Sequence, residues 1–308
     1  VLLLFAFVPQ FGAEGVWVSV FTAISAFCNA GFDLFGRFGA YSSLVPYVNN
    51  YYVQAVIMFM IISGGLGFMV WVELCQWYQK RRLSLHAKVV LSFSLILWLG
   101  GALGLGLMEW NNPASMGGLS VSDKIMASLF QSVSTRTAGM NTIDLAACGP
   151  ITKLLMSVLQ FIGAAPGSTG GGVKVTTFAV LFLTIRSVAQ GRDDCVIADH
   201  HIESKTVYRA LTIIVIGALA AFGSAVVVYY NTSDAVSVID AIFESCSAFG
   251  TVGLSVGVTA RLKDGAKLLY MAVMFMGRVG PVSLAMSLTA KPDDNKRKIM
   301  PVGHINVG

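Results

Sequence analysis

One pattern occurs three times, as Ser25-Ala-Phe-Cys-Asn-Ala-Gly-Phe32, Val133-Ser-Thr-Arg-Thr-Ala-Gly-Met140 and Ser247-Ala-Phe-Gly-Thr-Val-Gly-Leu254. In each copy a small polar residue is followed by Ala or Val, then by Gly, then by a large apolar residue. The three glycines, Gly31, Gly139 and Gly253, are almost evenly spaced, and each copy lies between long apolar runs. A repeat of this kind predicts one structural unit that is used several times along the chain.

The composition is typical of a membrane protein. Apolar residues make up 55% of the 308 residues and charged residues only 12%, whereas soluble domains carry about 25% charged residues. The net charge of +5 could suggest a nucleic-acid partner, but the basic residues cluster at the ends of apolar runs, as they do in cytoplasmic loops. We therefore expect a multi-pass protein of the lipid bilayer and no nucleic-acid partner. The clusters are Lys80 to Arg82 with His86 and Lys88, then Arg186, Arg192, Lys205 and Arg209, then Lys291 to Lys298.

The five cysteines, at positions 28, 75, 148, 195 and 246, are isolated from one another. Because no C-x-x-C pair occurs, neither a disulfide framework nor a zinc site is predicted. No Ser/His/Asp or Cys/His set suggests a catalytic nucleophile, so we do not expect an enzyme. His200 and His201 lie beside Asp193, Asp194 and Asp199 and could bind a metal, but a solvated cytoplasmic loop is the favoured interpretation.

Five apolar segments are candidates for crossing the membrane, namely 53–78, 88–110, 152–186, 207–230 and 266–291. Four of them have about the 20 residues that a spanning helix needs. The third is too long and contains Gly163-Ala-Ala-Pro-Gly-Ser-Thr-Gly-Gly-Gly172, which a continuous helix would not tolerate. We expect two helical pieces joined by an irregular loop, which persists at membrane depth only where protein or a water-filled cavity surrounds it.

Shorter amphipathic stretches at 14–27, 122–134 and 233–249 each end at one copy of the motif. They are short for a crossing, and we interpret them as re-entrant pore helices. A helix that ends inside the membrane directs the negative end of its dipole there, which favours a cation. The order is then outer helix, pore helix, glycine turn and inner helix, with the pore helices on the outer side. Asp33 and Asp144 follow two of the motifs and could make the outer mouth acidic, although ordinary loop solvation explains them as well.

Glycine is what the motif needs if its backbone carbonyls are to replace the hydration shell of an ion. Such a filter must direct its C=O groups toward one axis, which requires φ and ψ values that glycine adopts readily. One such string would be weak support, because glycine is common at helix contacts in membranes. Three copies, each after a segment of pore-helix length, predict a cation-selective filter.

The glycine-rich loop also invites comparison with a phosphate-binding P-loop. That motif requires G-x-x-x-x-G-K-[ST], but here Val173 separates Gly172 from Lys174, and Val175 stands where Ser or Thr is needed. A membrane enzyme that binds phosphate through Lys174 is therefore a weak alternative. A secondary transporter with broken helices and a midplane site is a second one, but inverted repeats would favour it.

Isolated charges in the apolar segments suggest further roles. Arg278 lies within an apolar segment, where a charge costs about 2.5–3.5 kcal/mol on insertion scales. We favour a pore-lining position for it over an ion pair with Glu73 or Glu109. Arg136, within the second motif, is expected to pair behind the pore, with Glu244 as its partner. Glu109 and Trp110 are interpreted as anchors at the membrane interface.

Together these motifs resemble the Trk/Ktr/HKT superfamily of potassium translocators, and in particular the membrane subunit of bacterial Ktr systems. The resemblance rests on residues 25–36, 132–144, 163–174, 247–257, 277–284 and 300–308, and it covers nearly the whole chain. It implies an all-α integral membrane fold, in which repeated M1–P–M2 units (helix, re-entrant pore helix, helix) surround one pore with pseudo-fourfold symmetry.

The resemblance also implies which residues form the pore. The selectivity filter that binds K⁺ would comprise Cys28, Asn29, Ala30, Gly31, Thr137, Ala138, Gly139, Gly250, Thr251, Val252 and Gly253. The gate would comprise Gly163, Pro166, Gly167, Ser168, Thr169, Gly170, Gly171, Gly172 and Lys174, with Arg278 beside it. A structural kink that relieves helix crowding is the alternative role of this loop.

The implied function is channel-like K⁺ uptake across the bacterial cytoplasmic (inner) membrane. Two subunits would form a homodimer with separate pores, on a cytosolic ring of nucleotide-binding RCK/KTN subunits. The nucleotide would bind only to that partner, and Na⁺ is a possible activator. The repeats would occupy residues 1–80, 81–191 and 192–308. Because the superfamily has four repeats, the N-terminal one is expected upstream of Val1, and the chain alone should not conduct.

Overall fold

The computed structural model describes residues 1–39, 42–191, 195–197, 200–232 and 236–280. Its helices are α1 (Leu4–Phe11), α2 (Glu14–Phe27), α3 (Tyr51–Gly65), α4 (Phe68–Lys80), α5 (Leu85–Glu109), α6 (Val121–Ser134), α7 (Pro150–Phe161), α8 (Val175–Ala189), α9 (Ser204–Asn231), α10 (Val238–Gly250) and α11 (Asp264–Val279). Three 3₁₀ turns, η1 (Phe35–Phe38), η2 (Val45–Tyr47) and η3 (Thr259–Arg261), and the strands β1 (Cys195–Ile197) and β2 (His200–Ile202) complete it.

Helices α2, α6 and α10 lie where the sequence predicts pore helices, and each ends at a glycine motif. Ser120 caps α6 by accepting from the backbone N–H of Asp123, and Ser237 caps α10 by accepting from the N–H of Ile239. Such hydroxyl caps satisfy amides that the first helical turn leaves free. The predicted third segment began at 233, but residues 233–235 lie outside the described part of the chain.

Among the described residues, α5 and α9 are the two helices that are long and apolar enough to cross a membrane by themselves. They contain 25 and 28 residues, which at 1.5 Å per residue is about 37 and 42 Å, more than the roughly 30 Å of hydrocarbon. Helices α3 and α4 pass the same test only when taken together. Of the predicted segment 266–291, only the part up to residue 280 is described.

Two of the predicted inner helices are broken, and the sequence predicted only one of the breaks. The expected interruption separates α7, which ends at Phe161, from α8, which begins at Val175. The prediction of one continuous helix over 53–78 was wrong, because α3 and α4 meet at an angle of 101°. The bend occurs at Gly67, whose φ of +83° is a value that glycine adopts readily. At the bend, Phe68 N–H donates to the carbonyl of Gly167.

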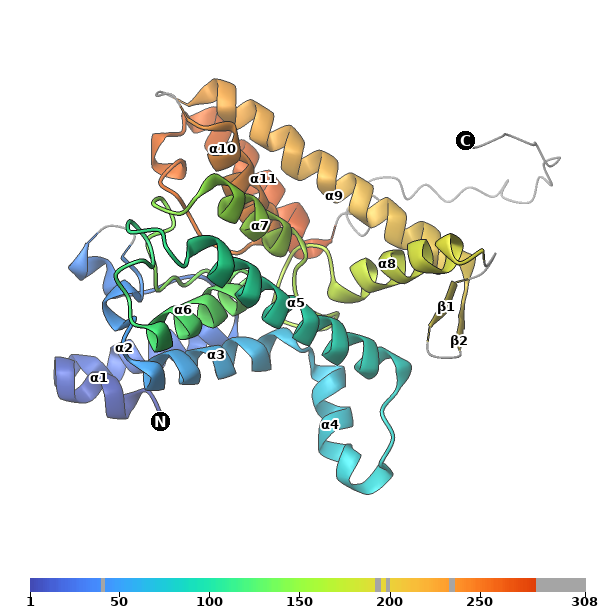
Figure 1. Ribbon diagram of the computed structural model, residues 1–308, viewed down its shortest axis with the longest axis horizontal. Coiled ribbons are helices and arrows are strands. Elements are labelled where there is room, and N and C mark those ends of the chain that lie inside the picture. The colour runs from blue at the N-terminus through green and yellow to red at the C-terminus, as the bar shows by residue number, and fades with distance from the viewer. Residues whose placement is uncertain (40–41, 192–194, 198–199, 233–235, 281–308) are drawn as a thin grey trace.

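The three pore helices are packed among the longer helices. Helix α2 contacts α1 and α3, α6 lies between α3 and α5, and α10 contacts α7, α9 and α11. Figure 1 shows α5 and α6 side by side in the middle of the molecule, with α9 running along one edge. The main buried apolar cluster joins α2, α3 and α6 through residues such as Val18, Ile57 and Phe130. The pore-helix ends are therefore held in the interior.

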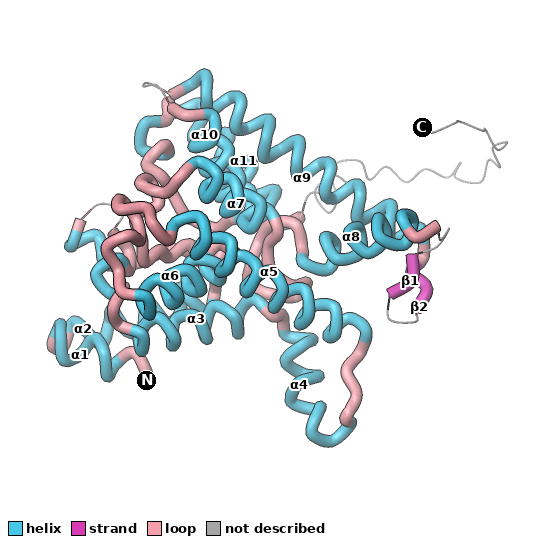
Figure 2. Tube along the Cα trace, viewed as in Figure 1, coloured by secondary structure: helices cyan, strands magenta, loops and turns pink. Residues whose placement is uncertain are grey.

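Figure 2 shows that many loops gather on one side of the helices, at the left of the view, while others cross between the helices. The end of α4, where the first basic cluster lies, and the β1–β2 hairpin lie away from that side (Figure 1). His200 and His201 belong to this antiparallel hairpin. The basic run 291–298, the family-like tail 300–308 and Asp193, Asp194 and Asp199 lie outside the described residues.

Candidate functional site

The glycines of the three motifs meet at one place in the fold. A Cβ on Gly31 would lie 2.7 Å from the carbonyl oxygen of Val252, 3.4 Å from Gly253 Cα and 3.6 Å from Gly139 Cα. A Cβ on Gly139 would overlap the same Val252 oxygen. These glycines come from segments more than a hundred residues apart in sequence, yet their backbones are in direct contact. At Gly31 and Gly139 a side chain larger than hydrogen would overlap the backbone of the third motif, whereas at Gly253 a Cβ would meet nothing closer than 3.4 Å.

The three turns share one backbone conformation. The glycines have φ values of +74°, +77° and +94°, and the residues two positions earlier, Asn29, Thr137 and Thr251, also have positive φ, at +49°, +76° and +51°. The intervening Ala or Val does not. An alternation in the sign of φ turns successive peptide groups to the same side. Positive φ at a β-branched threonine is strained, and such strain concentrates at functional sites.

A backbone hydrogen bond closes each turn on its own pore helix. Ala30 N–H donates to the Ser25 carbonyl at 2.9 Å, Ala138 N–H to Ser134 at 3.0 Å and Val252 N–H to Ser247 at 2.9 Å. The amides are thus directed back toward the helix ends. This leaves the turn carbonyls available to other groups, which is the requirement of a carbonyl filter.

Each of these serines also binds the residue after its glycine, a feature that the sequence analysis missed. Ser25 Oγ donates to the Phe32 carbonyl at 2.6 Å, Ser247 Oγ does so to Leu254 at 2.7 Å, and Ser134 Oγ donates to Met140. In two copies the hydroxyl also accepts, from Phe32 N–H at 3.1 Å and Met140 N–H at 3.0 Å. The serine lies six residues before the glycine in the first and third copies and five before it in the second, so the aligned pattern did not mark it, and its partner could not be read from one sequence.

The turns differ in how far protein surrounds them. Thr137, Ala138 and Gly139 of the second turn are buried. Gly31 of the first turn is half-buried, and Gly253 of the third is exposed. The second turn therefore lies innermost, with the other two at its sides.

The segments that follow the motifs also converge. A cavity of about 460 Å³ is lined by residues after the first motif (Phe38, Ser42, Val45, Pro46), after the second (Asn141, Asp144, Leu145, Ala146) and after the third (Ser255, Val256, Gly257). Asp144 belongs to this lining, and its carboxylate also accepts from Ala146 N–H at 2.9 Å. Asp33 does not, and its carboxylate instead accepts from Phe35 N–H at 2.9 Å. For Asp33 the ordinary local role is the one that the structure shows.

Three consecutive residues of the glycine-rich loop, 163–174, each lie against a different motif. Thr169 Oγ1 accepts from the Asn29 side-chain amide at 3.1 Å. A Cβ on Gly170 would overlap Thr137 Oγ1, and one on Gly171 would overlap Thr251 Oγ1. The loop thus crosses the three residues of positive φ that precede the glycines.

Backbone hydrogen bonds fasten this loop to the breaks in its neighbours. Thr169 N–H donates to the Gly64 carbonyl at 3.2 Å and Ala165 N–H to Gly65 at 3.0 Å, both at the end of α3. On the other side, Gly172 N–H donates to the Gly277 carbonyl at 3.0 Å. Pro166 and Gly167 lie beside Gly67, at the bend between α3 and α4. Ser168 Oγ turns back to the carbonyl of Ala165 at 2.5 Å.

Lys174 and Arg278 lie at the same end of the loop. Lys174 Nζ donates to the Gly170 carbonyl at 2.6 Å, so the ammonium fastens the loop to its own end. Arg278 lies on the last turn of α11, is exposed, and acts electrostatically on Lys174. Glu109 has other partners, which removes one of the two ion pairs considered for Arg278. The neighbouring Gly277 carbonyl accepts from Gly172 N–H of the loop, and a pore-lining role for Arg278 stays a prediction.

Two expectations for buried charges were wrong. Arg136 does not pair with Glu244, because its guanidinium donates to the Gly163 carbonyl, at the start of the glycine-rich loop. Glu244 instead accepts from the segment after the third motif. Glu109 is no interfacial anchor either, since it is only 1% exposed and accepts from Gly149 N–H at 2.8 Å and Thr152 Oγ1 at 2.5 Å.

The remaining candidates supply no second site. Within the described residues no group of three His, Cys, Asp or Glu side chains could hold a metal ion. The aspartates that the sequence places beside His200 and His201 lie outside those residues. Cys28 is half-buried at the end of α2 and forms no disulfide. What remains chemically is a set of backbone carbonyls, crowded at one junction and closed on one side by a loop. Such a set can replace water around a monovalent cation.

Comparison with known proteins gives one consistent result. The family described as TrkH, cation transport protein, matches residues 4–299. The Ktr system potassium uptake protein B of Bacillus subtilis is 34% identical over 302 residues, which are 98% of this chain and 66% of the relative. The potassium/sodium uptake protein NtpJ of Enterococcus hirae is 36% identical over 294 residues, 94% of this chain and 64% of the relative. The chain thus spans slightly less than two thirds of these relatives.

A solved structure agrees in fold. The crystal structure of the potassium transporter TrkH from Vibrio parahaemolyticus superimposes with a TM-score of 0.70, over 93% of this chain and 62% of that one. The sequence identity is 19%, so this likeness concerns the fold alone.

Proposed function

Because the chain belongs to the TrkH family of cation transport proteins, we propose that it is a channel-like translocator that takes up K⁺ across the bacterial cytoplasmic membrane. The family is one of membrane ion transporters and not of enzymes. The observation that carries the proposal is the meeting of Gly31, Gly139 and Gly253, with positive φ in all three.

In this proposal the filter consists of backbone carbonyls at residues 28–31, 137–139 and 250–253. The amides before the glycines donate back to the pore helices, so the carbonyls are free to face an ion. The C-terminal ends of α2, α6 and α10 lie at the same junction, and their partial negative charge favours a cation there. Because the three glycines are in contact, ion passage requires the turns to move apart.

The glycine-rich loop is the gate in this proposal. This role is supported by the contacts of Thr169, Gly170 and Gly171, each of which faces one of the three turns. Lys174 fastens the loop through the Gly170 carbonyl, and Arg278 lies beside it. The loop is also bonded to the ends of α3 and α11, so a movement of either helix would move the loop.

The transported ion and the partners follow from the relatives. The Bacillus protein is named for potassium uptake and the Enterococcus protein for potassium and sodium uptake. We propose K⁺ as the transported ion here, with Na⁺ as an activator. The Bacillus relative is named as protein B of a Ktr system, which suggests a system of more than one subunit. We infer a membrane subunit that works with a separate regulatory subunit. We propose a homodimer on a cytosolic ring of RCK/KTN type that alone binds the nucleotide.

Substitution of Gly139 tests the filter. In a host that lacks its own potassium uptake, the intact transporter with Gly139→Cys should not support growth at low K⁺ or uptake of K⁺, because a Cβ there overlaps the Val252 carbonyl. Gly118→Ala is the matched control, since no atom lies within 4 Å of a Cβ at Gly118. Uptake by the Gly139 variant equal to that of the control would refute the filter.

A further inference from the structure

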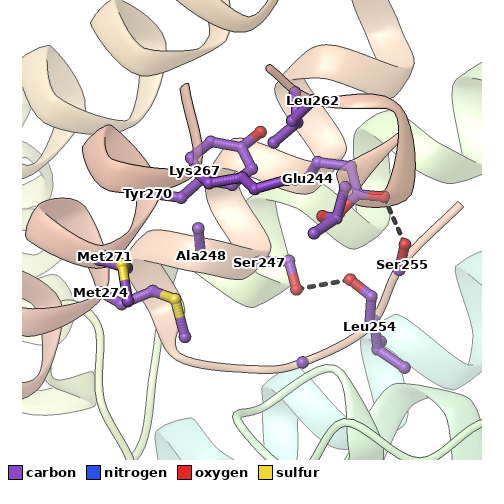
Figure 3. Close-up of a pocket in the computed structure, with 12 residues that line it drawn as sticks. Glu244, Ser247, Ala248, Leu254, Ser255, Leu262, Lys267, Tyr270, Met271 and Met274 are labelled. Carbon is purple, nitrogen blue, oxygen red and sulfur yellow. Dashed lines mark hydrogen bonds between the residues drawn. The ribbon is translucent and has the colours of Figure 1, made fainter. Parts of the chain in front are cut away.

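Glu244 lies on the pore helix α10, one turn before Ser247, and is 3% exposed. Its Oε1 accepts three hydrogen bonds, from Ser255 Oγ at 2.5 Å and from the N–H groups of Val256 and Val258 at 3.0 Å each. Its Oε2 accepts a fourth, from Thr259 Oγ1 at 2.8 Å. All four donors belong to the segment that follows Gly253. Figure 3 shows Glu244 reaching Ser255, with Ser247 bonded to Leu254 beside it.

The equivalent positions of the other pore helices carry no charge. Counting three residues back from the bonding serines Ser25, Ser134 and Ser247 gives Thr22, Gln131 and Glu244, and counting nine back from the three glycines gives Phe130 in place of Gln131. Thr22 and Gln131 are fully buried, and neither the Thr22 hydroxyl nor the Gln131 amide has a hydrogen-bond partner in the part of the chain that the structure describes. Of these three residues, only Glu244 is a carboxylate, and it binds the segment 255–259 that follows its turn.

The third turn is joined directly to the segment that Glu244 holds. Ser255 follows Leu254, the last residue of the third motif, and Gly253 lies one residue further back. Gly253, Glu244, Ser247 and Leu254 line one cavity of about 390 Å³. Hydrogen bonds to a charged acceptor are about twice as strong as those between neutral groups, so four of them hold residues 255–259 firmly against α10.

We propose that Glu244 is a positioning residue that sets the ion preference of the filter. Through residues 255–259 it fixes where the third turn, and with it the Gly253 carbonyl, can lie. A carbonyl filter discriminates between ions by the number and arrangement of its dipoles, so a loosened turn accepts a smaller ion more readily. This inference rests on the proposed filter function and adds to it a residue that does not itself touch the ion.

Glu109 provides a matched control. It too is a buried carboxylate with four donors, from Asn112, Ser115, Gly149 and Thr152. Its donors join the end of α5 to the start of α7. Of these donors, Gly149 comes soonest after a motif, nine residues after Met140, whereas the donors to Glu244 begin at Ser255, directly after Leu254. If both buried carboxylates had a purely structural role, Glu109→Gln and Glu244→Gln would have the same effect on ion preference.

The experiment compares K⁺ and Na⁺ uptake by the intact transporter in vesicles, in wild type, Glu244→Gln and Glu109→Gln. Glu244→Gln removes the charge but keeps an acceptor, and it should lower the K⁺ over Na⁺ preference by about tenfold, the worth of one hydrogen bond to a charged acceptor. Glu109→Gln should reduce thermal stability and leave the preference unchanged. Equal preference in wild type and Glu244→Gln would overturn the inference, as would an equal loss in both variants.

Two milder variants keep the inference testable if Glu244→Gln fails to accumulate. Ser255→Ala and Thr259→Val each remove one donor while the carboxylate remains, and each should shift the preference in the same direction by a smaller factor. An unchanged preference in both would refute the role of Glu244. Wild-type vesicles that take up no K⁺ would instead refute the proposed transport function, so the two failures are distinguishable.

Discussion

Gly170 lies so close to Thr137 that a Cβ on the glycine would overlap the threonine Oγ1. Gly170 belongs to the interruption between α7 and α8, and Thr137 to the second motif, so this contact joins the glycine-rich loop to the turn it closes. Its two sequence neighbours repeat the relationship, Thr169 with Asn29 and Gly171 with Thr251. Three residues in a row thus contact three turns, and this arrangement is what the proposed gate role depends on.

Replacing Gly170 by alanine should therefore open the gate. The added methyl group would overlap Thr137 Oγ1 and crowd Ala164, and the loop, held mainly by backbone hydrogen bonds, has to move away. We expect a higher K⁺ flux through the intact transporter, measured in vesicles without the regulatory subunit. Gly100→Ala on α5 is the control, because a Cβ there meets no atom within 4 Å. Flux in Gly170→Ala that equals or falls below that of the control would contradict the gate.

The serine that binds the residue after each glycine should matter for both stability and selectivity. Ser134→Ala leaves the N–H and the carbonyl of Met140 buried without their hydroxyl partner, which costs about 1–3 kcal/mol. We predict a lower melting temperature in detergent and a weaker preference for K⁺ over Na⁺. Ser92→Ala is the control, since Ser92 is exposed and bonds only to carbonyls of its own helix. A melting temperature equal to that of Ser92→Ala would count against the role of Ser134.

The ion pair between Lys153 and Asp240, with 2.8 Å between Nζ and Oδ1, joins α7 to the pore helix α10. Their side chains are 11% and 25% exposed, so removal of one partner should cost about 2 kcal/mol, less than the roughly 3–5 kcal/mol of a fully buried pair. Lys153→Met should lower thermal stability more than the double variant Lys153→Met with Asp240→Leu, which leaves no unpaired charge. A double-mutant cycle with additive effects would show that the pair is not coupled.

Local signals in the sequence predicted the pore helices well. Segments 14–27 and 122–134 were placed almost at the bounds of α2 and α6, because both stretches are amphipathic and a glycine motif follows each. The loop between α7 and α8 was equally predictable, since three consecutive glycines after a proline exclude a helix. These features depend on residues that are close in sequence.

The features that the sequence did not reveal depend on partners far along the chain. The bend at Gly67 is stabilised by the Gly167 carbonyl, a hundred residues away, and the glycines of Gly64-Gly65-Leu66-Gly67 in an apolar run were not interpreted as a break. Glu109 near a span end looked like an interfacial residue, but residues 149 and 152 bury it. Arg136 and Glu244 were paired by charge alone, whereas Arg136 donates to the Gly163 carbonyl and Glu244 accepts from Val256 N–H.

The most direct test of the central claim is a density map of the intact transporter in K⁺, compared with maps in Rb⁺ or Ba²⁺, whose stronger scattering identifies bound ions. We predict ion density on one axis, beside the backbone carbonyls next to Gly31, Gly139 and Gly253. Ions bound elsewhere, or turns that face lipid without any density between them, would contradict the claim.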